Sequence, residues 1–180
     1  MNKKQAQVRW QVFPRNRAAT NHQRQVIGIF ESLVLTIGTP DHRLKSNEVL
    51  AAVRKDLEEI GYEIEGSEKV ARPVLYGESD RPGKTFNVDG WHEETGTILE
   101  VEAGQAVENN RFAIDLLKAL SIQDANHLIM AIPANYHPER LKSAGRPPKR
   151  EFDEVVKFLD ALFVAGRVDL PLRSIIVIGY

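Results

Sequence analysis

Residues 85–104, TFNVDGWHEETGTILEVEAG, decide the fold because they read as two strands joined by a short turn. We predict a first strand over residues 85–93, a turn over 94–96 and a second strand over 97–103. Side chains alternate across a strand, so Glu100 and Glu102 share one face of the sheet, while Leu99 and Val101 share the other.

The register of this hairpin brings acidic residues together. If the turn is centred on Glu94 and Thr95, then Asp89 lies opposite Glu100 and Asn87 lies opposite Glu102. Facing side chains are only about 4.5–5.5 Å apart, so the carboxylates in this patch would repel one another. A slip of one residue would move Asp89 to the opposite face, so the prediction depends on the register.

A hard divalent cation is the simplest compensation for such a patch. Mg²⁺ takes oxygen ligands from one or two carboxylates and completes its shell with water and substrate phosphate. Mn²⁺ is the alternative ion. The competing interpretation is a solvated hairpin, because antiparallel sheets often expose one polar face to water.

The spacing of these residues resembles the signature of the PD-(D/E)xK nuclease superfamily, which has the restriction-endonuclease-like fold. Asp89 is followed by ten residues and then by Glu100-Val101-Glu102. The resemblance implies that Asp89, Glu100 and Glu102 are catalytic, and that Asp89, Glu100 and the backbone carbonyl of Val101 bind the metal. In the family the third position is usually Lys and helps to position the attacking water. Glu102 occupies that position here, as Glu or Gln does in some active restriction endonucleases, and Val88 replaces the Pro of the signature.

The order of the surrounding elements extends the resemblance over roughly residues 21–136. The family core runs helix, three antiparallel strands, helix, strand, and we expect an α/β fold with a mixed central sheet flanked by helices. Apolar periodicity predicts helices over 21–36, from Ser46 to Gly61, over 105–122 and over 151–164. Apolar runs predict strands over 73–77, 127–134 and 174–180, with a short strand over 62–65. The third helix is expected to bury Val107, Asn110, Ala113, Ile114, Leu117 and Leu120.

Charge is distributed unevenly along a chain whose net charge is −1. Residues 1–30 contain six Lys and Arg and no Asp or Glu, and residues 139–150 contain five Lys and Arg against Glu139. Such segregation suits a polyanion held beside an acidic site, although it also fits an ordinary solvated surface. The candidate nucleic-acid contacts are Arg15, Arg17, Lys84, Arg111, Arg146, Lys149 and Arg150. We expect residues 1–20 to form a basic arm and residues 21–180 a single domain; Trp10 and Phe13 could either stack on nucleic acid or pack on that domain.

Composition sets the outer limits of the prediction. The chain has 180 residues, 42% of them hydrophobic, and no cysteine, which excludes disulfides and thiolate metal sites. No apolar run is long enough to span a bilayer, so we expect a cytoplasmic protein without a membrane partner. The resemblance implies a metal-dependent deoxyribonuclease that acts on DNA, and we expect a homodimer because two symmetric active sites can cut both strands. Two alternatives remain: a catalytically inactive nucleic-acid-binding or interaction protein on the same fold, and a phosphoesterase or phosphotransfer enzyme that acts on small substrates.

Overall fold

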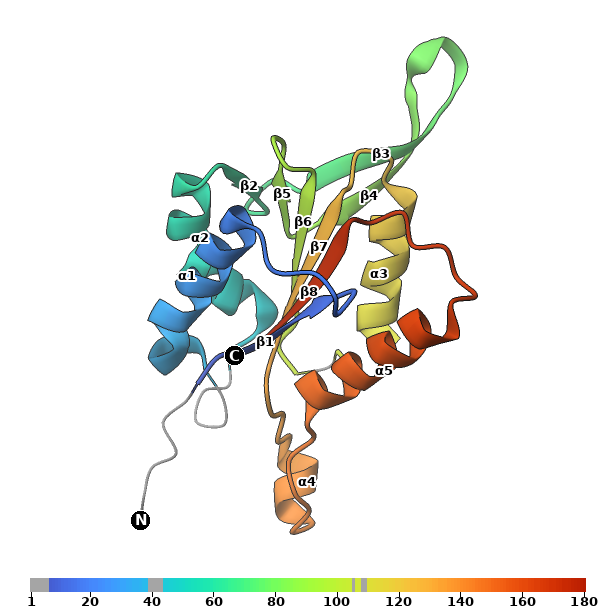
Figure 1. Cartoon of the computed structure of the whole chain (residues 1–180). Coiled ribbons are helices and arrows are strands. Elements are labelled where there is room, and N and C mark those ends of the chain that lie inside the picture. The colour runs from blue at the N-terminus through green and yellow to red at the C-terminus, as the bar shows by residue number, and fades with distance from the viewer. Residues whose placement is uncertain (1–6, 39–43, 105, 108–109) are drawn as a thin grey trace.

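The computed structural model describes residues 7–38, 44–104, 106–107 and 110–180. Its centre is a six-stranded mixed sheet in the order β1-β8-β7-β6-β5-β2 (Figure 1). The strands of this sheet are β1 (Arg9–Phe13), β2 (Tyr62–Ile64), β5 (Gly90–His92), β6 (Thr97–Val101), β7 (His127–Ile132) and β8 (Ser174–Gly179). Strands β3 (Val70–Tyr76) and β4 (Pro82–Val88) form a separate two-stranded sheet. The expected α/β class with a mixed central sheet is confirmed.

Helices cover both faces of the central sheet (Figure 1). One layer contains α1 (Asn21–Ile37) and α2 (Ser46–Glu59), and the other contains α3 (Arg111–Ser121) and α5 (Glu151–Ala165). The short helix α4 (Glu139–Ser143) begins the basic segment of residues 139–150. A 3₁₀ turn over Glu78–Asp80 connects β3 to β4.

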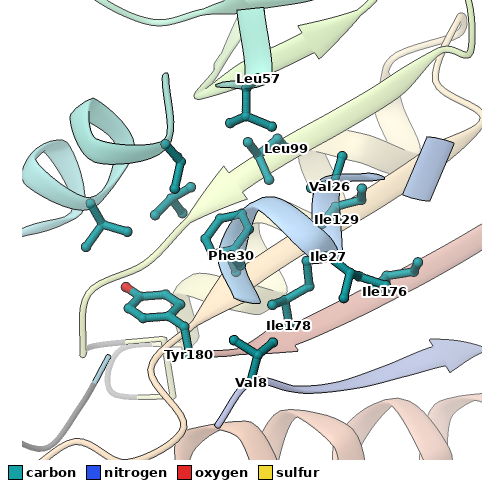
Figure 2. Close-up of a cluster of buried hydrophobic side chains, with 14 of the residues drawn as sticks. Val8, Val26, Ile27, Phe30, Leu57, Leu99, Ile129, Ile176, Ile178 and Tyr180 are labelled. Atoms are coloured by element: carbon teal, nitrogen blue, oxygen red, sulfur yellow. The ribbon is translucent and has the colours of Figure 1, made fainter. Parts of the chain in front are cut away.

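The central strands are apolar on both faces, which explains why helices can pack on each side. Alternate residues of β6, β7 and β8 divide between two core clusters. Leu99, Ile129 and Ile176 meet the α1–α2 layer around Phe30 (Figure 2). Ile98, Leu128 and Ile175 belong instead to the cluster formed with α3 and α5. The continuous apolar runs in β7 and β8 therefore have the pattern of strands that are buried on both faces.

The predicted register of the hairpin is confirmed, because Gly90 pairs with Leu99 and His92 pairs with Thr97. The first strand of the prediction is wrong in one respect: residues 85–93 do not form a single strand. They divide at Asp89 into β4, which pairs with β3, and β5, which pairs with β6 and β2. Asn87 consequently pairs with Ala71 and does not lie opposite Glu102.

The expected order of helix, three antiparallel strands, helix and strand is present, with a different first strand. Strands β2, β5 and β6 form the antiparallel series, and β7 then pairs parallel to β6 after α3. Residues 73–77 lie instead in and just after β3, outside the central sheet. The sequence misassigned them because β2 is only three residues long and gives a weak local signal.

The N-terminal segment is part of the fold where it is described. Residues 9–13 form the edge strand β1, which pairs antiparallel with β8. Phe13 is fully buried, whereas Trp10 is partly exposed. The expectation of an arm over residues 1–20 is therefore wrong for residues 9–13, and residues 1–6 lie outside the described part of the chain. No helix in the described ranges is long and apolar enough to cross a membrane.

Candidate active site

The carboxylate of Asp89 is fixed at the junction of the two sheets. Asp89 is the single residue between β4 and β5, and its side-chain Oδ2 accepts a hydrogen bond of 2.7 Å from the backbone N–H of Val101. Its backbone carbonyl accepts a second bond, of 2.8 Å, from the N–H of Glu65. Asp89 is thus tied directly to the end of β6, where the two glutamates lie.

Glu100 points into the layer formed by α3. Only 5% of the residue is exposed, and its Oε1 lies 3.5 Å from Nζ of Lys118. Lys118 also contacts Asp115, with 2.7 Å between Nζ and Oδ1. Glu102, two residues further along the chain, lies 3.6 Å from a guanidinium nitrogen of Arg111, the first residue of α3. Among the residues that the structure describes, the patch therefore contains four carboxylates and two cations.

The backbone around Glu102 is also held in place. The hydroxyl of Tyr180 donates a bond of 2.6 Å to the carbonyl of Glu102, and the N–H of Glu102 donates to the carbonyl of Ala131. The N–H and C=O of one residue point to the same side of an extended strand. Because the N–H of Val101 points toward Asp89, the carbonyl of Val101 is expected on that side too.

Burial and repulsion between carboxylates raise the pKa values of all three acidic groups, Asp89, Glu100 and Glu102. Burial raises the pKa of Glu100 from 4.5 to about 9, with repulsion from Asp115 and Asp89 adding to it and Lys118 opposing it. Burial likewise raises the pKa of Asp89 to about 6, although the hydrogen bond from Val101 opposes the rise. The pKa of Glu102 rises to about 7 through burial and Asp115, against the effect of Arg111. In each case burial is the largest cause of the raised pKa, and repulsion from neighbouring carboxylates adds to it.

Lys118 shows the complementary behaviour. Burial lowers the pKa of its ammonium group, but Glu100 and Asp115 outweigh that effect and the net pKa is raised. The ammonium is therefore held as a cation. Lys118 and Arg111 together supply two positive charges to four carboxylates, so the formal charge of the described patch stays negative when all four are ionised.

The donor chemistry of the patch fits a hard divalent cation. Oε1 of Glu100 is buried and accepts no hydrogen bond from the described residues. Asp89 and Glu100 supply the oxygen ligands that Mg²⁺ and Mn²⁺ prefer. In the arrangement seen here, no three His, Cys, Asp or Glu side chains of the described ranges already converge on one metal position. Lys118 lies at the orphaned oxygen of Glu100 instead.

Sequence reasoning missed Asp115 and Lys118 because it placed the wrong face of α3 inward. The helix begins at Arg111, whereas the prediction began it at Gln105, which lies outside the described residues. The buried residues are Phe112, Asp115, Leu116 and Ala119. Two residues of the predicted stripe are largely exposed, Ile114 at 53% and Leu117 at 63%. Phe112, Leu116 and Ala119 form an apolar stripe of their own, and the position of Asp115 within that stripe was the signal in the sequence that could have identified it.

The candidate nucleic-acid residues occupy different parts of the molecule. Arg111 lies in the acidic patch itself. Lys149 is bridged through its backbone to Tyr136, whose ring packs against Gly104, two residues after Glu102. Arg146 is on the same segment, and its carbonyl accepts a bond from His137. Arg111 therefore lies at the carboxylates, and the segment that carries Arg146 and Lys149 is connected to the end of β6 through Tyr136.

Arg15 and Arg150 belong to a neighbouring cleft of about 640 Å³, which Arg9 and Lys157 also line. Arg15 is paired there with Asp160 at 2.5 Å, and Arg9 with Asp153 at 2.7 Å.

Arg17 and Lys84 lie further from the patch. Arg17 acts electrostatically on His127, which pairs with Thr97 at the opposite end of β6 from Glu102. Lys84 is on β4, five residues before Asp89, and its ammonium lies over the ring of Phe86.

Comparison with known proteins adds no assignment to this geometry. No protein-family model matches the chain, and a search of curated proteins finds no significant match.

Proposed function

We propose that the protein is a divalent-metal-dependent nuclease that hydrolyses phosphodiester bonds of DNA. The observation that carries the proposal is the buried patch at the end of β6, where Asp89 and Glu100 converge with Lys118 beside them. Asp89 and Glu100, with the carbonyl of Val101, would hold Mg²⁺ or Mn²⁺. When bound, the ion would supply positive charge to the phosphate and would lower the pKa of the attacking water. The proposal implies a cytoplasmic protein with access to DNA.

Lys118 supplies the charge that the sequence signature lacks. The family signature places a Lys two residues after the second acidic residue, and Glu102 occupies that position here. The ammonium of Lys118 comes to the patch from α3 and lies 3.5 Å from Glu100. It orients the Glu100 carboxylate and places a positive charge where a phosphate oxygen would develop negative charge.

Glu102 is suited to proton transfer. Its pKa is raised to about 7, so a substantial fraction is ionised at neutral pH and can accept a proton. In the proposed reaction its side-chain oxygen accepts the proton of the attacking water. The guanidinium of Arg111 lies 3.6 Å from the Glu102 carboxylate, and it would leave that carboxylate to bind the phosphate that enters the site.

One observation favours the alternative of a catalytically inactive binding protein. Lys118 and Arg111 already pair with Glu100, Asp115 and Glu102, so the patch has internal counter-charges. An inactive relative could retain this network as a structural feature. It would still bind nucleic acid through the basic residues near the end of β6.

Cleavage of supercoiled plasmid and of single-stranded DNA, with Mg²⁺ or Mn²⁺ and with a chelator, tests the proposal. The matched variants are Asp89→Asn, Glu100→Gln and Lys118→Met, each close in size to the native residue. We expect a loss of at least about 100-fold in rate for each, as removal of a group that acts in the transition state usually produces. Glu63→Gln, an exposed substitution on β2, is the control and should cut at the native rate.

Two results decide against the nuclease. Absence of metal-dependent cutting by the native protein, together with retained DNA binding, would support the inactive binding protein. Equal cutting by the native protein and by Glu100→Gln would show that any activity comes from elsewhere.

A further inference from the structure

The two-stranded sheet β3–β4 is a ribbon that projects from the body of the molecule (Figure 1). Each strand has seven residues, and pairing runs from Val70 with Val88 at the root to Tyr76 with Pro82 near the tip. The root residues Val70 and Val88 are buried in the core on the α3–α5 side. The ribbon is exposed from Leu75, at 61%, and Tyr76, at 51%, onward, whereas Val74 still packs against the core.

The root of the ribbon is firmly attached beside the candidate active site. Asp89 follows Val88 directly, so the ribbon leads into the first carboxylate of the patch. Arg72 anchors the root: its guanidinium lies 4.0 Å from the ring centroid of Trp91 and 3.5 Å from Glu93. A duplex bound at Asp89 would therefore lie beside the root of the ribbon.

The dimensions of the ribbon match a groove of DNA. The exposed end of the ribbon runs from Leu75 to Lys84, about five residues on each side, which at about 3.4 Å each give a reach of at most about 17 Å. The strands of a ribbon are about 4.8 Å apart. The major groove of B-DNA is about 12 Å wide and admits a two-stranded β-ribbon.

The side chains near the tip suit base edges better than phosphates. Arg81 and Lys84 are exposed cations, and Glu78 and Asp80 are exposed acids in the connecting turn. A protein surface that only follows phosphates is cationic, whereas Glu78 and Asp80 would be repelled by phosphates. In the major groove Arg and Lys bind guanine and carboxylates accept from the cytosine amino group. Leu75 and Tyr76 can meet the thymine methyl group there.

We propose that the β3–β4 ribbon enters the major groove of duplex DNA and determines which sequences are brought to the acidic patch. This inference rests on the proposed function, since it assigns the substrate preference of the same site. The ribbon carries sequence and duplex selectivity, while the patch carries the chemistry.

The test uses the full chain with two kinds of variant. One removes the exposed cations by Arg81→Ala with Lys84→Ala, and its charge-matched control is Lys55→Ala with Arg167→Ala, both exposed outside the ribbon. The other replaces residues 75–83 by Asn-Gly, which forms a two-residue hairpin between Val74 and Lys84. Circular dichroism and thermal unfolding check that each variant is folded.

Two readouts separate the ribbon from the chemistry. Binding of duplex and single-stranded oligonucleotides, with Ca²⁺ or chelator present, is measured by fluorescence anisotropy. Both ribbon variants should lose at least tenfold in duplex affinity and less than twofold in single-strand affinity. Sequencing of the ends cut from a randomised duplex library should show a base preference in the native protein that the ribbon variants lose.

Several outcomes would overturn the inference. One is unchanged duplex affinity in both ribbon variants. Another is an identical base preference at native cutting rate. A native dimer that becomes a monomer when residues 75–83 are replaced, with duplex affinity retained, would show that the ribbon binds a second copy of the chain. If no form of the protein cuts DNA, the nuclease proposal fails, and the anisotropy measurements still decide the role of the ribbon.

Discussion

Replacing Glu100 with Gln should stabilise the metal-free protein at alkaline pH and leave it unchanged in acid. The substitution keeps the size and most of the polarity of the side chain but removes its ionisation. In the folded protein the pKa of Glu100 is about 9, against an ordinary value of 4.5. Between these values the unfolded chain has released a proton that the folded protein retains. Stability therefore falls as pH rises through this range.

The magnitude follows from the pKa shift. Each pH unit between the two pKa values costs up to about 1.4 kcal/mol, so at pH 8 the upper limit is about 5 kcal/mol. Glu100→Gln also removes the 3.5 Å contact of the Glu100 carboxyl group with Lys118, including the attraction to the fraction of Glu100 that is ionised, which leaves that cation with Asp115 alone. We therefore expect a net gain of about 2–4 kcal/mol at pH 8. For a chain of this size that corresponds to a rise of about 5–15 °C in Tm.

Thermal unfolding of both proteins from pH 4.5 to pH 9 in chelator provides the assay. The Tm curves should coincide near pH 4.5 and separate progressively as pH rises. Glu63→Gln, which is exposed on β2, should follow the native curve throughout. Native and Glu100→Gln Tm curves that stay parallel over the whole pH range would contradict a raised pKa of Glu100, because they would show that Glu100 ionises normally in the folded protein.

Three further predictions concern Lys118 in the acidic patch, the neighbouring rings of His22 and His92, and Leu99 in the core. At pH 9, where Glu100 ionises, Lys118→Met should cost about 3–5 kcal/mol in the native background and less with Glu100→Gln, where only Asp115 loses its cation, measured by urea unfolding; equal costs in both backgrounds would contradict the ion pair. Burial and the neighbouring His92, whose ring centroid lies 4.0 Å away, lower the pKa of His22 to about 4. The unfolded chain binds a proton there below pH 6.5, so Tm should fall from pH 6.5 to pH 4. His22→Gln should reduce this slope, and an unchanged slope would count against the assignment. Leu99→Ala should cost about 2–5 kcal/mol, since Leu99 is fully buried under α1 and α2, and a cost below about 1 kcal/mol would show a loosely packed core.

The sequence was informative where local chemistry determines structure. The turn over residues 94–96 and the alternation of β6 predicted that Asp89 would come opposite Glu100, and the pairing of Gly90 with Leu99 agrees. The long apolar runs of β7 and β8 likewise identified buried central strands.

The rest depended on contacts that are distant in sequence. Strand β1 pairs with β8, more than 160 residues away. The division of residues 85–93 at Asp89 arises because two different partners, β3 and β6, compete for one extended segment. Lys118 was missed because it reaches the patch from a different element, whereas a signature read along one strand includes only residues of that strand.

A titration of Mn²⁺ into the protein at pH 7.5, with the free ion measured by electron paramagnetic resonance, tests directly whether Asp89 and Glu100 form a metal site. We expect the native protein to bind the ion and Glu100→Gln to bind it at least tenfold more weakly, while Glu63→Gln binds it normally. Equal binding by the native protein and Glu100→Gln, or no binding by either at millimolar Mn²⁺, would contradict a metal site at the end of β6.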